Sequence, residues 1–268
     1  MYEEYWKLKE KPFENTPDPK FFYHSPNHEE ALMRLYYVIR ERKGAGLLTG
    51  EYGSGKTVLT RFIVRELSQQ TDNYKIALIV NPSLSAKDFL KEIIFQLEGR
   101  EYDGSKLKIL HTLNDIFYKG KEEQKDIVVI VDEAQVIDKA DMFEELRLLL
   151  NFQMNDRFLL SLILVGQPEL REKINRLPQL KQRMAISFHL NVLSPQESTR
   201  YIEHRCNIAG AAKPLFTGEA MKIISEHSDG IPRRMNTYCE LALMQGMLNK
   251  REIIDAETAT QAVEDINT

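Results

Sequence analysis

The chain has 268 residues, of which 43% are hydrophobic and 28% are charged. These fractions are typical of a folded globular protein and exclude bulk disorder and fibrous or collagen-like structure. It has 36 lysines and arginines against 40 aspartates and glutamates, and the formal net charge is -4. That balance excludes a protein that coats polyanions through its overall charge, although it leaves room for a local basic patch.

Three features indicate a cytoplasmic protein. Cys206 and Cys239 form no CxxC pair and no disulfide framework, so we interpret them as ordinary reduced cysteines. The first residues are acidic and aromatic, unlike an export signal. The most apolar stretches, residues 127–131 and 158–165, are far shorter than the roughly 20 residues of a membrane-spanning helix and have the length of buried strands.

Along the chain, short apolar runs alternate with amphipathic stretches, which predicts a parallel sheet flanked by helices. Residues 1–26 are rich in proline and aromatic side chains, and we expect them to form an irregular, docked segment. Strands are predicted at residues 45–49, 76–80, 127–131, 159–165 and 186–190. Helices are predicted at residues 27–41, 55–69, 85–97, 105–118, 139–152 and 168–184, with a solvated loop at 119–125.

After Leu193 the strand pattern stops, and the remaining sequence predicts only helices. These cover residues 195–208, 217–227, 232–248 and 256–265. Ser194 is placed to cap the first of them, with Glu197 at the matching position of a capping box. We therefore expect an α/β domain over residues 1–192, which includes the N-terminal segment, and a small all-α domain over residues 193–268.

The strongest motif follows the first predicted strand. It is the phosphate loop Gly50-Glu51-Tyr52-Gly53-Ser54-Gly55-Lys56-Thr57, which fits the pattern G-x-x-x-x-G-K-S/T between a strand and a helix. Glycines allow backbone N–H groups to turn inward around phosphate oxygens, and the start of a helix attracts anions. Lys56 would supply charge to the β- and γ-phosphates, and the Thr57 hydroxyl would be a ligand of Mg²⁺. The alternative is a glycine-rich turn with a chance lysine.

The second motif is a pair of carboxylates after the third predicted strand, which ends at Val131. Open parallel sheets bind ligands at the carboxyl ends of their strands. Asp132 would contact hydrated Mg²⁺, and Glu133 would orient and deprotonate the attacking water. One carboxylate cannot easily do both, because a metal-bound carboxylate is a poor base. Together with the phosphate loop, this pair predicts hydrolysis of ATP or GTP.

Four further polar residues are candidates within this frame. Asn81 follows the second strand and could hold Glu133 away from water, or it could simply serve the turn before Pro82. Gln167 follows the fourth strand and could reach the γ-phosphate or the water, or it could be a turn residue. Arg183 lies just before the fifth strand.

The fourth candidate, Arg233, lies beside Arg234 at the start of a helix of the all-α domain. Arginine suits the spread of negative charge on a transferring phosphoryl group, although such arginines are more often surface ion-pair residues. The histidines have no metal-binding spacing with a cysteine, and we interpret His28, His111, His189, His204 and His227 as structural.

With these motifs in place, the chain resembles AAA+ ATPases, and within them the ExeA-like ATPases of general secretion, which are related to transposition-adaptor ATPases. The matching segments are Pro12-Phe13, Thr16-Pro17-Asp18-Pro19, Phe22-Tyr23, residues 28–32, residues 48–53, Asp132-Glu133-Ala134-Gln135, residues 145–149 with Asn151, residues 165–170, Gln182-Arg183 and Gly230-Ile231-Pro232-Arg233. The resemblance implies a five-stranded sheet in the order 5-1-4-3-2 and a helical lid.

The resemblance also implies roles for individual residues. Arg183 matches the arginine finger that reaches the nucleotide of a neighbouring subunit, and Arg233 matches the second sensor on the lid. Gln167 lies at the first sensor, and Asn81 lies at the glutamate switch. Secretion members often continue into a membrane helix and a peptidoglycan-binding domain, whereas this sequence stops at Thr268. A direct role at the envelope is therefore less expected, unless those parts lie on another chain or this chain is a fragment.

The sequence thus predicts a cytoplasmic AAA+ switch that binds and hydrolyses ATP with Mg²⁺ and assembles into a ring or filament. Two biological settings are compatible with it: a DNA-associated, transposition-type adaptor that works with a transposase, and an ATPase of a secretion, pilus or envelope assembly system. The lack of membrane and cell-wall modules favours the first, although the net charge of -4 predicts weak non-specific affinity for DNA. A third alternative is a nucleotide-binding scaffold that does not hydrolyse, against which the Asp132–Glu133 pair argues.

Overall fold

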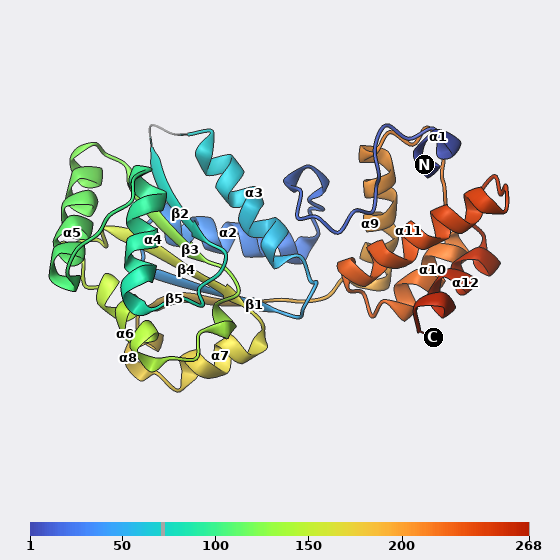
Figure 1. The fold of residues 1–268 in the computed structure, drawn as a ribbon. Helices are drawn as coiled ribbons and strands as arrows, with labels where there is room; N and C mark the ends of the chain where they lie inside the picture. The colour runs from blue at the N-terminus through green and yellow to red at the C-terminus, as the bar shows by residue number, and fades with distance from the viewer. Residues whose placement is uncertain (71–72, 268) are drawn as a thin grey trace. The chain divides into compact units, whose positions relative to one another are not determined.

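A computed structural model describes residues 1–70 and 73–267 of the chain. The chain folds into two compact units (Figure 1). The sheet unit comprises Glu29–Gly50 and Leu59–Leu190, and the helical unit comprises Met1–His28, Glu51–Val58 and Asn191–Thr268. The phosphate loop after Gly50 therefore belongs to the helical unit.

The sheet unit is built on five parallel strands. They are β1 (Ala45–Gly50), β2 (Tyr74–Ile79), β3 (Asp126–Val131), β4 (Leu160–Gly166) and β5 (Met184–Leu190). Their order across the sheet is β2-β3-β4-β1-β5, which confirms the predicted order. In register, Thr49 pairs with Gly166, and Val131 pairs with both Ile79 and Leu164. The residues that follow β3 and β4 therefore leave from the same edge at which β1 ends.

Helices follow or connect these strands. They are α2 (Pro26–Arg40), α3 (Lys56–Ser68), α4 (Ala86–Glu98), α5 (Lys106–Glu122), α6 (Ala140–Leu149), α7 (Pro168–Asn175), α8 (Pro178–Lys181) and the 3₁₀ turn η2 (Ala134–Val136). The helix predicted over residues 168–184 is in fact α7 and α8, because Pro178 favours a new helix start and disfavours helical backbone at Leu177. The first residues of α2 and α3 are grouped with the helical unit.

The predicted loop at residues 119–125 is also wrong in part, since α5 continues to Glu122. Gly120 lies against Ile127, where an added Cβ would come within 2.9 Å of the isoleucine Cδ1 atom. Lys119 and Lys121 lie in the last turn of α5, where positive charges stabilise a helix through its dipole. Packing against β3 therefore extends α5 to Glu122, although the charged residues after 118 predicted a loop.

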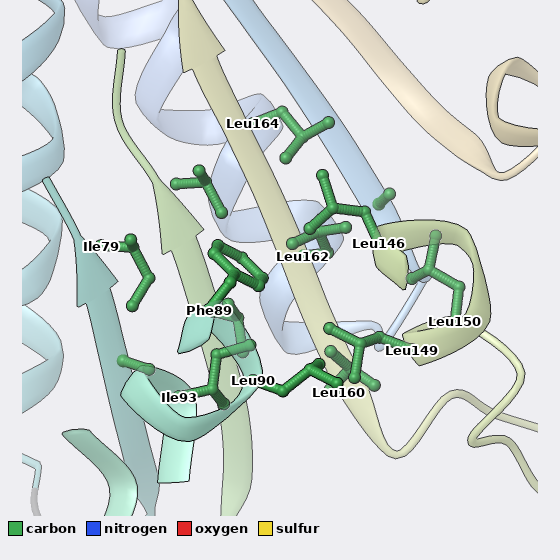
Figure 2. Close-up of a cluster of buried hydrophobic side chains, with 14 of the residues drawn as sticks. Ile79, Phe89, Leu90, Ile93, Leu146, Leu149, Leu150, Leu160, Leu162 and Leu164 are labelled. Atoms are coloured by element: carbon green, nitrogen blue, oxygen red, sulfur yellow. The ribbon is translucent and has the colours of Figure 1, made fainter. Parts of the chain in front are cut away.

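The core of the sheet unit is apolar on both faces of its central strands. Every residue of β4, and every residue of β3 except Asp126, is buried, which is typical of strands covered by helices on both sides. Figure 2 shows side chains of β2, β4, α4, α6 and the residue after α6 converging: Ile79, Phe89, Leu90, Ile93, Leu146, Leu149, Leu150, Leu160, Leu162 and Leu164. This packing fixes the sheet whose carboxyl edge carries the candidate chemistry.

The helical unit has a separate core. Its helices are α1 (Tyr2–Trp6), η1 (Pro19–Phe21), α9 (Pro195–Ile208), α10 (Gly218–His227), α11 (Pro232–Leu248) and α12 (Ala256–Asn267). The predicted capping box is confirmed: the Glu197 N–H donates to the Ser194 hydroxyl, and the Glu197 carboxylate accepts from the Ser194 N–H. Cys206 and Cys239 are free and buried in this core, and burial raises the pKa of the Cys206 thiol to about 12.

The N-terminal segment docks within the helical unit. The Trp6 indole donates to the Leu243 carbonyl at 2.9 Å, and the Phe13 ring meets Phe216 edge-on. The buried Arg205 guanidinium donates to the Pro12 carbonyl at 2.5 Å and to the Glu14 carbonyl at 3.1 Å. Docking of the segment at residues 1–26 was expected from its aromatic residues. The expected α/β domain of residues 1–192 included this segment, whereas the structure groups it with the helical unit. Within residues 1–70 and 73–267, no helix is long and apolar enough to cross a membrane.

Candidate functional site

The phosphate loop takes its shape from two glycines with left-handed backbone angles. Gly53 has φ 81° and Gly55 has φ 104°, a region that side chains with a Cβ atom rarely adopt. The Ser54 N–H closes a turn onto the Glu51 carbonyl at 3.1 Å, and α3 begins directly afterwards at Lys56. A tight glycine turn at a helix start is the arrangement that binds phosphate groups through backbone N–H donors.

The side chains of the loop carry polar groups that suit an anion. Lys56 is only 5% exposed, and its ammonium group donates to the Glu51 carbonyl at 2.9 Å, so the side chain folds back across its own loop. The Ser54 hydroxyl is buried and has no hydrogen-bond partner among the described residues. Because a buried polar group without a partner is costly, this hydroxyl fits a loop that completes its hydrogen bonds with a ligand.

His28 supports the loop from within the helical unit, a role that sequence reasoning missed. Its Nε2 atom lies 3.3 Å from the Ser54 carbonyl, and its Nδ1 atom lies 2.8 Å from the Ser25 hydroxyl. A Cβ atom on Gly55 would come within 2.9 Å of the same Nε2 atom. His28 therefore fixes the position of the loop backbone, and it requires glycine at residue 55. The only sequence signal was its place in the 28–32 segment of the family resemblance.

Arg233 contacts the same loop from the start of α11. Its backbone N–H donates to the Gly53 carbonyl at 3.3 Å, and its guanidinium lies 4.9 Å from the centre of the Tyr52 ring. A Cβ atom on Gly53 would come within 2.8 Å of the Arg233 Cβ atom, so this close approach also needs glycine. The structure thus brings the predicted second sensor to the phosphate loop.

A small cavity of the helical unit opens beside the loop. It is lined by the N-terminal segment, the start of α3, α9 and the start of α11: Thr16, Asp18, Phe21, Phe22, Tyr23, His28, Gly55, Val58, Leu193, Tyr201, Arg205 and Pro232. Aromatic rings and apolar side chains form most of this lining. A cavity of that kind suits a flat, weakly polar group next to a phosphate-binding loop.

The two predicted carboxylates lie at the carboxyl edge of the sheet. Asp132 is 3% exposed, and its N–H continues the ladder by donating to the Ile79 carbonyl at 2.9 Å. The Asp132 carboxylate accepts from the Glu133 N–H at 2.9 Å. Glu133 has left-handed angles, φ 52° and ψ 32°, which are uncommon for a residue other than glycine. This sharp turn separates Asp132, at the end of the ladder, from Glu133, which is the N-cap of η2.

The structure assigns Glu133 a partner that the sequence did not suggest. The Gln135 side-chain amide donates to the Glu133 carboxylate at 2.5 Å. Its oxygen accepts from the Gln167 N–H at 3.1 Å. The predicted first-sensor residue, Gln167, is thereby connected to Glu133 through Gln135.

Asn81, predicted as the glutamate switch, follows β2, the strand that pairs with β3. Its side chain is exposed, and its oxygen accepts from the Ser83 N–H at 3.2 Å. That bond is typical of an asparagine that stabilises its own turn. The turn role, which the sequence left open for Asn81, is the one that the structure displays.

Arg183 lies at the start of β5, whereas the carboxylates lie after the end of β3. In a parallel sheet these are opposite ends of the strands. Arg183 precedes β5, whose first residue, Met184, pairs with the first residue of β1. Its guanidinium donates to the Leu150 carbonyl at 3.5 Å and to the Asn151 side-chain oxygen at 3.2 Å. As predicted, β5 is the edge strand beside β1, so Arg183 is far from the carboxylates of its own sheet.

Comparison with known proteins places these motifs in a family. The AAA domain family matches residues 39–174, which is more than half of the chain. This chain belongs to the AAA domain family. General secretion pathway protein A of Aeromonas hydrophila is 39% identical over 248 residues, so the predicted ExeA-like branch is confirmed. That match covers 91% of this AAA chain but 44% of the relative, so the chain spans less than half of the relative's length.

Solved structures share the AAA fold at low identity. The Aeropyrum pernix ORC2 protein, solved as ADPNP and ADP complexes, has a TM-score of 0.74 and 20% identity, covering 96% of this chain and 71% of that one. The Aeropyrum pernix ORC1 protein in complex with DNA has a TM-score of 0.68 and 15% identity, covering 93% and 69%. At these identities the likeness concerns the fold alone.

The side chains of the AAA motifs also show which groups could hold a metal ion. Among residues 1–70 and 73–267, no group of three or more His, Cys, Asp or Glu side chains could hold one. Mg²⁺ is usually held by one or two side-chain oxygens, water and substrate phosphates. Thr57 and Asp132 supply a hydroxyl and a buried carboxylate of that type.

Proposed function

We propose that this AAA protein binds ATP with Mg²⁺ and hydrolyses it as an oligomeric switch. The observation that carries the proposal is the phosphate loop, where two left-handed glycines, a folded-back Lys56 and a buried Ser54 hydroxyl surround the start of a helix. Lys56 would bind the β- and γ-phosphates, together with backbone N–H groups of residues 50–57. The ORC2 structure, solved with ADPNP and ADP, supports nucleotide binding by this fold.

The cavity beside the loop would receive the nucleotide base. It lies within the same unit as the phosphate loop and offers aromatic surfaces, among them Phe22 and Tyr23. Arg233 would interact with the phosphates from the lid, because its backbone already bonds to Gly53. Nucleotide binding at the loop would thus be coupled to the start of α11.

Hydrolysis would depend on the carboxylates of the sheet unit. Bound Mg²⁺ would neutralise phosphate charge, and Thr57 and Asp132 are the residues that would hold it. Glu133 would accept the proton of the attacking water, and the Gln167 side chain would contact the γ-phosphate or that water. These roles come from the residue types at the ends of β1, β3 and β4.

The proposed oligomer would supply Arg183 from a neighbouring subunit. Arg183 lies at the sheet edge opposite to Asp132, so it is poorly placed to act on a nucleotide bound near the carboxylates of its own chain. A ring or filament would bring this arginine to the next subunit's nucleotide. Hydrolysis would then loosen that contact and reset the assembly.

For the biological setting we favour a secretion, pilus or envelope assembly system. The relative that supports this setting is 39% identical over 91% of this chain. Its name describes a longer protein, of which the match covers 44%. This reverses the preference drawn from the sequence for a transposition-type adaptor, which none of the relatives above specifically supports. A DNA-associated role is the second candidate, because a structure of the same fold is solved with DNA.

The test of the proposal is release of phosphate from ATP, measured with and without Mg²⁺. We expect turnover that stops on chelation with EDTA and that rises with protein concentration as subunits assemble. Protein of the Lys56→Ala variant, purified in the same way, controls for contaminating ATPases. Wild-type phosphate release equal to that of this control would refute the proposal. Adding double-stranded DNA separates the two settings: stimulation supports the DNA-associated role, and no change supports the secretion role.

A further inference from the structure

The side chain of Gln135 bridges two strand ends of the sheet unit. Its NH₂ group donates to the Glu133 carboxylate at 2.5 Å, and its carbonyl oxygen accepts from the Gln167 N–H at 3.1 Å. Glu133 follows β3, and Gln167 follows β4 as the N-cap of α7. A single amide therefore connects the proposed general base to the backbone at the proposed first sensor.

The surroundings of Gln135 hold this bridge in place. Gly166 allows the approach, because a Cβ atom there would come within 2.5 Å of the Gln135 side-chain oxygen. Lys173 of α7 donates to the Gln135 carbonyl at 2.7 Å and to the Ile137 carbonyl at 2.9 Å. The turn that carries Glu133 is thus bonded to α7 through both the side chain and the backbone of Gln135.

We propose that Gln135 is a positioning residue that sets the orientation of the Glu133 carboxylate and couples it to Gln167. The inference rests on the proposed role of Glu133 in hydrolysis. Glutamine suits the position because it provides one donor for a carboxylate and one acceptor for an N–H group on the same planar amide. Asn81 does not perform this task in the structure, since its side chain bonds to Ser83.

The bridge also gives a route from the nucleotide to the base. A ligand contact that moves Gln167 or the start of α7 would change the hydrogen bond to Gln135, and the amide would then turn relative to Glu133. Because proton transfer depends on heavy-atom distances of about 2.6–3.2 Å, a small rotation of the carboxylate changes turnover strongly. Nucleotide affinity should change little, because Gln135 lies outside the phosphate loop.

The experiment compares two substitutions with a matched control. Gln135→Met keeps the length of the side chain but removes both hydrogen bonds, and Gln135→Glu keeps the acceptor while placing a second negative charge beside Glu133. The control is Gln96→Met, because Gln96 is an exposed glutamine of the sheet unit that donates to Glu92 at 2.8 Å. For both Gln135 variants we expect kcat to fall about 10-fold or more, with the Kd for ATP unchanged.

A double-mutant cycle with Glu133→Gln distinguishes this role from a structural one. If Gln135 acts through Glu133, then Gln135→Met in the Glu133→Gln background should lower kcat no further, within about 2-fold. An unchanged kcat in both Gln135 variants, a further loss in the double variant, or an equal loss of ATP affinity would each overturn the inference. If Glu133→Gln itself turned over ATP at the wild-type rate, the proposed function would fail instead.

Discussion

The phosphate loop and the carboxylate turn are held in place in different ways. The loop depends on backbone geometry, with glycines at φ 81° and 104° and with loop carbonyls that contact the His28 imidazole and the Arg233 N–H. The turn after β3 depends on side-chain hydrogen bonds, in which Gln135 joins Glu133 to Gln167. Backbone geometry is fixed by folding, whereas a side-chain bridge can be remade when a ligand arrives.

This difference has a consequence for function. Changes in the loop should remove nucleotide binding, and changes in the turn should remove turnover while binding persists. The helical unit holds the loop, and the sheet unit holds the turn, so the two kinds of effect should also separate between the two units.

The most complete loss is expected from Lys56→Ala, which removes the charge from the loop and should abolish both ATP binding and turnover. At ATP concentrations of about 100 times Kd, the wild type should gain roughly 2.7 kcal/mol of stability through ligand binding, and the variant should gain almost none. The ATP-induced rise in melting temperature measures this gain. Lys222→Ala, which removes an exposed lysine of α10 in the same unit, should behave like the wild type. An equal rise in Lys56→Ala would show that the loop does not bind the phosphates.

Arg183→Ala tests whether turnover needs a group that neither the loop nor the turn of the same chain supplies. An arginine finger contributes about 10³- to 10⁵-fold in rate, so the variant should be nearly inactive, with ATP binding retained. Arg176→Ala, which changes an arginine at the end of α7 whose side chain is 80% exposed, serves as the control.

Mixing Arg183→Ala with Lys56→Ala subunits sharpens this test. Some interfaces would then pair an intact loop with an intact arginine, so phosphate release should recover in part. A mixture that stays inactive, with activity per subunit that does not change with protein concentration, would show that Arg183 acts within its own chain or has no role.

Glu133→Gln should lower turnover by about 10²-fold or more, because the amide cannot accept a proton from water. The substitution is close to isosteric, and the phosphate loop is unchanged, so ATP affinity should remain at the wild-type value. Single-turnover phosphate release and equilibrium ATP binding measure the two quantities separately. A loss of binding as large as the loss of turnover would break the distinction between loop and turn.

The sheet and the phosphate loop could be predicted because their signals are local. Each strand is a short apolar run, and the loop has fixed glycine spacing, so neither depends on distant partners. The end of α5 was missed because Gly120 packs on Ile127, a contact that charged residues 119–125 do not reveal. The docking partner of the N-terminal segment was missed for a similar reason, since Arg205 binds the Pro12 and Glu14 carbonyls across a long sequence separation.

The partner of Glu133 could not be predicted from the sequence either. Asn81 and Gln135 both lie after strands beside the carboxylates, and both carry a side-chain amide. The left-handed conformation of Glu133 decides between them, because it directs the carboxylate toward the residue two positions later in η2. A glutamate gives no signal for that conformation, which glycine or asparagine would have suggested.

The smallest effect is expected from His28→Ala, which tests whether the loop is held by its backbone. The substitution removes the imidazole that contacts the Ser54 carbonyl at 3.3 Å. A typical hydrogen bond contributes about 1 kcal/mol, so ATP binding should weaken about 5-fold. His227→Ala is the matched control, because its exposed imidazole also contacts a backbone carbonyl of the helical unit, that of Ile223 at 2.9 Å. With ATP at saturation, kcat should match the wild type, since Glu133 and Gln135 belong to the other unit. A lower kcat at unchanged affinity would mean that the loop backbone also positions the reacting groups, and the division between binding and turnover would no longer hold.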